Sequence, residues 1–230
     1  MIRSVLAASA LTIVVSDALA QGIEGGQIGF AFDDNLNHGN SQTTLGGSLG
    51  FGLGGLSLQG DLSKRINSDD PGAVSLGAHA IANVGEQSAV GAFLTYDNLS
   101  GTAHDYTWGV EGKLSTGQNS PFVLEGYLMR VTRNAGRSNF NALGVDAELG
   151  VGRASAVTAG YFSTDDAADL SRYSIGLSQE LAPNVSVGLT AARQNSGTHH
   201  DTLVGLTLDY TFGNGATFGR RGYPQLTPGF

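Results

Sequence analysis

The sequence predicts an all-β fold, a transmembrane antiparallel up-and-down β-barrel of about 12 strands within a range of about 10 to 14. Apolar and polar residues alternate with a period of two along nearly the whole chain, which is the pattern of strands with two different faces. The connections between these segments are short and rich in turn residues. The polar face is mainly Gly, Ser and Thr: glycine accounts for 35 of 230 residues, and only 14% of residues are charged.

Residues 1–20 are typical of a signal peptide. Arg3 gives a basic start, the apolar run "SVLAASALTIVV" follows, and small residues at Ala18 and Ala20 suit cleavage by a signal peptidase. The run is too short to span a bilayer as a helix. We therefore expect an exported chain whose mature part begins near Gln21. With no cysteine, its stability must come from backbone pairing and side-chain burial.

Twelve segments of the mature chain have strand periodicity. The clearest is "VGLTLDYTF" (residues 204–212), with apolar or aromatic residues at every even position. Proline falls only in connections or at a strand start among these segments, where a missing N–H group is tolerated. The predicted strands lie near residues 25–34, 41–51, 54–64, 72–83, 87–97, 104–115, 120–132, 138–149, 153–163, 170–181, 184–194 and 201–212.

Two architectures have this alternation. In a soluble β-sandwich the apolar face is the core, and the outer face normally carries many Lys and Glu residues. In a membrane barrel the apolar face contacts lipid and the polar face lines a lumen. Eleven residues at about 3.3 Å each and about 40° tilt cover about 28 Å, close to the apolar band of about 25 Å. The composition and the strand length favour the barrel.

Aromatic residues give a second test of the barrel. If both chain ends lie in the periplasm, most of them map to the two ends of the strands, as expected for interfacial girdles. The predicted girdle consists of Tyr96, Tyr106, Trp108, Tyr161, Tyr173, Tyr210 and Phe212.

With these features the chain resembles a Gram-negative outer-membrane β-barrel protein of the small, porin-like kind. The resemblance covers residues 21–212 and includes the last strand, which ends at Phe212 like the family's C-terminal assembly signal. It implies insertion by the barrel-assembly machinery through that strand and localisation in the cell outer membrane. Residues 213–230 depart from the pattern, since in many members the aromatic signal is the chain terminus. We expect them to form a periplasmic C-terminal tail.

A closed barrel of twelve strands would be about 24 Å across, between filled and open barrels. The side chains predicted to line its lumen are mostly small, which favours a narrow aqueous channel. Acidic residues collect in the inner half, where a ring of carboxylates would attract cations. The alternative is that these groups are spread out, solvated and partly paired. The predicted lumen-lining residues are Asp61, His79, Glu111, Lys113, Glu125, Asp146, Glu148, Glu180 and Asp209.

Basic residues map to the outer rim, at the level of lipopolysaccharide phosphates, which guanidinium groups bind well. The alternative is simple solvation. The predicted contacts are Lys64, Arg65, Arg130, Arg133, Arg172 and Arg193. No cofactor or metal is predicted; His38, His199 and His200 are near one another if the barrel closes, but hydrophilic loop residues are the simpler interpretation.

The leading functional hypothesis is passive diffusion of small, cationic or neutral solutes through a narrow acidic lumen. A structural barrel closed by its own tail is the alternative. An outer-membrane lipid hydrolase is less favoured, because its Ser-His pair must face lipid and His79 is predicted to face the lumen. We therefore predict no enzymatic activity. A net charge of −8 disfavours nucleic acid as a partner. The similar apolar face of every strand leaves the oligomeric state open.

The tail adds one further hypothesis. Arg220 and Arg221 lie within chain reach of the inner carboxylates, so the tail could partly occlude the pore. Deletion of residues 213–230 would then raise the conductance.

Overall fold

The computed structural model describes residues 22–68, 72–85, 87–99, 103–116, 122–134, 137–166 and 169–223. The predicted signal peptide, residues 1–20, lies outside these ranges, as does the end of the tail from residue 224 onward. No helix in the described part of the chain is long and apolar enough to cross a membrane.

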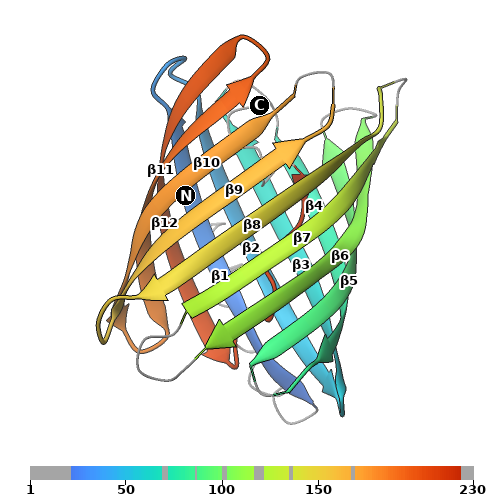
Figure 1. Cartoon of the computed structure of the whole chain (residues 1–230), viewed down its shortest axis with the longest axis vertical. Coiled ribbons are helices and arrows are strands. Elements are labelled where there is room, and N and C mark those ends of the chain that lie inside the picture. The colour runs from blue at the N-terminus through green and yellow to red at the C-terminus, as the bar shows by residue number, and fades with distance from the viewer. Residues whose placement is uncertain are drawn as a thin grey trace, which may run out of the picture.

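The described residues form one closed barrel of twelve strands, in which every strand pairs antiparallel with its sequence neighbours and β1 pairs with β12 (Figure 1). This confirms the predicted fold class and all twelve predicted strands. The strands are β1 (Ile23–Asn35), β2 (Ser41–Leu53), β3 (Leu56–Asn67), β4 (Ala73–Asn83), β5 (Ser88–Leu99), β6 (His104–Thr116), β7 (Phe122–Arg133), β8 (Phe140–Gly150), β9 (Ser155–Thr164), β10 (Ser171–Ala182), β11 (Val185–Ser196) and β12 (His199–Gly213).

The alternation in the sequence becomes an alternation of inward and outward side chains. On β3, Ser57, Gln59 and Asp61 are buried inside, whereas Leu58 and Leu62 are 46% and 56% exposed on the outside. Large apolar side chains are exposed in this way on strands all around the barrel. So much exposed apolar surface is unfavourable in water and favourable against lipid tails. The outer surface is therefore a lipid-facing surface.

Closure depends on the last strand. β12 pairs with β1 from Gly25 opposite Gly213 to Asn35 opposite Leu203, so both edges of the sheet are satisfied. β7 keeps a continuous register in which Glu125 lies opposite Lys113 and Asp146. Glu125 therefore faces the lumen.

The chain reverses direction at the end of β12 and re-enters the barrel. Gly213 and Gly215 have φ angles of +57° and +74°, a conformation that glycine adopts without strain. The Asn214 N–H donates to the carbonyl of Glu24 at 2.9 Å, and the Gly215 N–H donates to the carbonyl of Phe212 at 3.1 Å. Residues 217–223 then lie against the inner wall, and the red C-terminal segment is seen inside the barrel in Figure 1. We call residues 214–223 the inner segment.

The barrel interior carries two apolar clusters instead of small side chains alone. One contains Phe93, Tyr127, Met129, Val131, Phe140, Ala142, Phe162 and Leu170, with Tyr223 packed against it. The other contains Ile81, Ala89 and Phe218. The prediction that mostly small side chains line the lumen was therefore only partly correct. The inward positions of β5, β7, β8 and β9 include large residues, and the inner segment adds Phe218 and Tyr223.

Candidate functional site in the barrel lumen

A chain of alternating charges runs across the inner wall. Asp61 on β3, His79 on β4 and Glu111 on β6 were all predicted to line the lumen, and the fold brings them together. His79 Nε2 lies 2.8 Å from Asp61 Oδ2, and His79 Nδ1 lies 2.6 Å from Glu111 Oε1. With both carboxylates ionised, the two contacts are hydrogen bonds only when both ring nitrogens carry a proton, which makes His79 an imidazolium between two carboxylates.

The inner segment extends this chain of charges. Arg221 Nε donates to Glu111 Oε2 at 3.0 Å, and a second guanidinium nitrogen of Arg221 contacts Glu125 Oε1. The Arg221 side chain is only 2% exposed, and its guanidinium carbon lies 4.0 Å from the centre of the Tyr127 ring. The three carboxylates of Asp61, Glu111 and Glu125 are thus interleaved with the two cations of His79 and Arg221.

Gln59 holds the backbone of the inner segment. Its side-chain oxygen accepts from the N–H groups of Thr217 and Phe218 at 2.9 and 3.1 Å, and its side-chain nitrogen donates to the Phe218 carbonyl at 2.9 Å. The Lys113 ammonium donates to the Thr217 carbonyl at 2.7 Å. The Phe218 ring stacks on His79, with ring centres 6.4 Å apart. Wall side chains therefore replace the backbone partners that a strand would have.

The end of the inner segment packs among aromatic groups. The Tyr223 ring meets Phe140 edge to face at 5.0 Å, and the Arg133 guanidinium lies over both rings at 4.3 and 5.1 Å. The Tyr223 N–H donates to Asp97 at 3.3 Å. The inner segment thus contacts the wall from Gln59 to Phe140.

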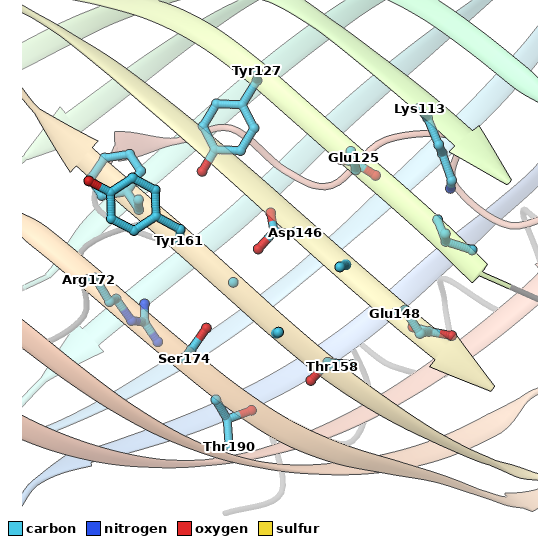
Figure 2. Close-up of a pocket in the computed structure, with 15 residues that line it drawn as sticks. Lys113, Glu125, Tyr127, Asp146, Glu148, Thr158, Tyr161, Arg172, Ser174 and Thr190 are labelled. Atoms are coloured by element: carbon cyan, nitrogen blue, oxygen red, sulfur yellow. The ribbon is translucent and has the colours of Figure 1, made fainter. Parts of the chain in front are cut away.

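A cavity of about 450 Å³, lined by both charged and apolar side chains, remains beside the inner segment. Its lining includes Glu125, Asp146 and Glu148 as acids and Lys113 and Arg172 as bases, with hydroxyl groups from Thr158, Ser174 and Thr190. In Figure 2 the hydroxyls of Ser174 and Thr158 lie between Arg172 and Glu148. The cavity is the part of the lumen in which a solute would meet charged groups.

The remaining predicted lumen residues lie away from this cavity. Asp209 accepts a hydrogen bond from Gln27 at 2.8 Å, near the Arg220 guanidinium, which packs over Gly29 and Gly46. Glu180 is exposed near the end of β10, on the inward parity of Arg172. The structure therefore divides the nine predicted residues into a buried charge chain, a cavity lining and these two separate acids.

The six predicted rim residues divide between the two faces of the wall. Lys64, Arg130 and Arg193 are exposed, as a contact with lipopolysaccharide would require. Three others point inward: Arg65 is buried, Arg133 lies over Phe140, and Arg172 lines the cavity. For these three a lipopolysaccharide contact does not fit. The reason is parity, because adjacent strand residues such as Lys64 and Arg65 face opposite sides.

Four of the seven predicted girdle residues form two aromatic pairs across neighbouring strands. Tyr96 lies opposite Tyr106, with ring centres 5.3 Å apart, and Tyr161 lies opposite Tyr173, with ring centres 4.9 Å apart. Trp108 is 52% exposed on the outer surface. On β12, the rings of Tyr210 and Phe212 lie 6.3 Å apart.

The sequence did not single out Gln59, Tyr127, Phe218 and Tyr223 as residues that contact the inner segment or belong to it. One signal was present in the sequence: "GNG" at residues 213–215 combines Asn and Gly as tight turns do, and it predicts a chain reversal directly after β12. The partners of the reversed chain carried no such signal. His38 lies 3.1 Å from Asp201, and His200 lies 2.8 Å from Asn195.

Comparisons with known proteins support the fold. No family model and no curated protein sequence matches the chain. Among solved structures, the KdgM porin matches with a TM-score of 0.61 and 10% identity, covering 80% of this chain and 98% of that one. The NanC porin matches with a TM-score of 0.60 and 8% identity, over 80% and 98% of the two chains.

A third similar structure is the outer membrane protein Omp33 of Acinetobacter baumannii, with a TM-score of 0.56 and 14% identity over 84% of this chain and all of that one. At such identities the likeness concerns the fold. The chain therefore has the closed twelve-strand barrel fold of outer-membrane porin-like channels.

Proposed function

We propose that this protein is an outer-membrane channel for small hydrophilic solutes, with a lumen narrowed by its own inner segment. The observation that carries the proposal is a cavity of about 450 Å³ with charged groups in its lining, inside a closed barrel whose outer surface is apolar. A barrel that served only as a membrane anchor would not need charged groups on both sides of an internal cavity. The similar solved structures include porins, which supports a channel of this class.

The nature of the solute is a finer proposal. One similar structure is a complex of the KdgM porin with disordered oligogalacturonate, but at 9% identity that ligand is not transferred to this chain. The cavity here carries three carboxylates, those of Glu125, Asp146 and Glu148, against the bases Lys113 and Arg172. When the adjoining charge chain is counted with the cavity, five carboxylates (Asp61, Glu111, Glu125, Asp146 and Glu148) lie with four cations (His79, Lys113, Arg172 and Arg221), so the excess of negative charge is small. We propose a weak preference for cations over anions.

Planar-bilayer recording tests both levels of the proposal. The full mature chain should conduct, and a salt gradient should give a reversal potential of the sign expected for a weakly cation-selective pore. The double variant Asp146→Asn/Glu148→Gln should lower the ratio of cation to anion permeability. Asp169→Asn is the matched control: it removes a carboxylate from an exposed loop and keeps a side chain that tolerates the φ angle of +45° there.

Two results would contradict the proposal at different levels. No conductance from wild type or any variant would contradict a channel and favour the structural barrel, an alternative that the partly filled lumen keeps open. Conductance with unchanged selectivity in the double variant would contradict only the role of the two cavity acids.

A further inference from the structure

We propose that Glu111, Glu125 and Tyr127 form a guanidinium-binding site in the lumen. Its present occupant is Arg221 of the same chain, and a free guanidinium cation can replace that side chain. The conductance test of this inference rests on the proposed channel function, whereas the binding test below does not.

The site offers what a guanidinium group needs. Glu111 and Glu125 approach from two neighbouring strands, β6 and β7, and contact different nitrogens of Arg221. Tyr127 supplies an aromatic face 4.0 Å from the guanidinium carbon. Figure 2 shows Glu125 and Tyr127 on the same strand at the border of the cavity. Two carboxylates with an aromatic face suit a planar, weakly hydrated cation better than a compact ammonium or metal ion.

The site is held in place by a second layer of side chains. The other oxygen of Glu111 lies 2.6 Å from His79, and His79 is in turn held by Asp61. The Gln59 side-chain nitrogen donates to Asp61 at 3.0 Å. These residues belong to the strand ladder of the wall, so the site stays formed when Arg221 is replaced.

The occupant, by contrast, lies outside the ladder. Arg221 belongs to a segment whose backbone is held by wall side chains, through three hydrogen bonds with Gln59 and one with Lys113. Truncation of Arg221 would leave the carboxylates of Glu111 and Glu125 without that guanidinium. Glu111 would keep its contact with His79, but Glu125, whose side chain is only 14% exposed, would lose its guanidinium partner. A largely buried carboxylate that has lost its counter-charge is unfavourable, so the vacated site would bind a matching cation from solution.

The first test is a chemical rescue of conductance. Arg221→Ala should raise the conductance of the full chain, because the inner segment loses its charged anchor. Millimolar methylguanidinium should then reduce the conductance of this variant while leaving wild type unchanged, and methylammonium at the same concentration should have little effect. Arg220→Ala is the matched control, because Arg220 packs over Gly29 and Gly46 instead and leaves the site filled.

The second test measures binding directly. Isothermal titration of methylguanidinium into Arg221→Ala barrels in detergent should give a heat of binding that wild type lacks. Adding Tyr127→Leu to this variant should weaken the binding by about two- to fivefold, the loss expected for one cation–π contact. Circular dichroism checks that each variant keeps its strand content.

The outcomes separate the two proposals. Binding without any conductance supports the guanidinium site and contradicts the channel. Conductance with equal effects of methylguanidinium on wild type and Arg221→Ala, or with equal effects of methylammonium, contradicts the guanidinium site and leaves the channel supported. Absence of binding in the titration contradicts the site whatever the conductance.

Discussion

At the scale of single residues, the inward glycines make room for other parts of the chain. A Cβ atom on Gly91 would lie 3.1 Å from the Phe218 ring and 3.2 Å from Glu111 Oε1. β5 lies between β4 and β6, so Glu111 reaches His79 across the position of Gly91. Because the predicted lumen residues are mostly small, the sequence predicts a water-filled space inside the barrel. In the structure, part of that space holds the inner segment and the buried charge chain.

Gly91→Val tests this role. We expect Phe218 to be displaced, the conductance to rise and the free energy of unfolding to fall by about 1–3 kcal/mol, as for other overpacked interiors. Urea unfolding in micelles and bilayer recording measure the two effects. Gly60→Val is the control, because that position faces outward and no described atom lies within 4 Å of an added Cβ. Equal effects of the two substitutions would contradict the assigned role.

At the scale of elements, successive side chains of each strand face lipid and lumen in turn, because side chains alternate between the two faces of a strand. On β11, Leu189 is 58% exposed on the outer surface, whereas the next residue, Thr190, lines the cavity. Both lie near the middle of the strand, so the local backbone and the depth in the membrane are nearly the same.

A lysine at each of these two positions should therefore have different effects. Leu189→Lys should lower the free energy of unfolding in vesicles by about 2–4 kcal/mol, the cost of a lysine on the lipid face near the bilayer midplane. Thr190→Lys should cost much less and should reduce cation preference. Denaturant titration in vesicles of both variants measures the difference. Similar losses at both positions would mean that the inward and outward assignments of β11 are incorrect.

The inner segment is an element of a different kind, because it lacks ladder pairing and its removal leaves the wall complete. Deletion of residues 214–230 keeps Gly213, which pairs with Gly25, and so keeps β12 whole. We expect a severalfold rise in single-channel conductance with unchanged strand content by circular dichroism. Unchanged conductance would show that the segment does not limit the flow of ions.

At the scale of the whole molecule, the fold could be predicted because a strand pattern of period two is local. The positions of Leu206, Leu208 and Tyr210 along one strand determine which face they share, whatever the partner strands are. The same parity placed Asp61, His79 and Glu111 in the lumen. The basic residues of the outer rim were less predictable. They were assigned by their position at the outer ends of the strands, and this position does not say whether a side chain faces lipid or the lumen. Arg65, Arg133 and Arg172 lie at inward-facing positions.

The candidate site could be predicted only as a list of lumen residues. Which of them meet depends on the register of β3 to β7 and on the gap at Gly91, and neither can be read from one strand. The pairing of Arg221 with Glu111 joins residues 110 positions apart. Chain reach made this contact conceivable from the sequence, but it did not select Arg221 over Arg220.

By itself the sequence predicted a membrane barrel of about twelve strands and which face of each strand is apolar, because side-chain alternation and strand length are properties of short segments. The tertiary structure decided what fills the lumen. β12 closes on β1 up to Gly213, and the chain that follows Gly213 turns back into the barrel. Inside the barrel, Gln59, Lys113 and Glu125 become hydrogen-bond partners of the inner segment. Hydrogen bonds and charge pairs between distant residues depend on three-dimensional position, which a local pattern does not contain.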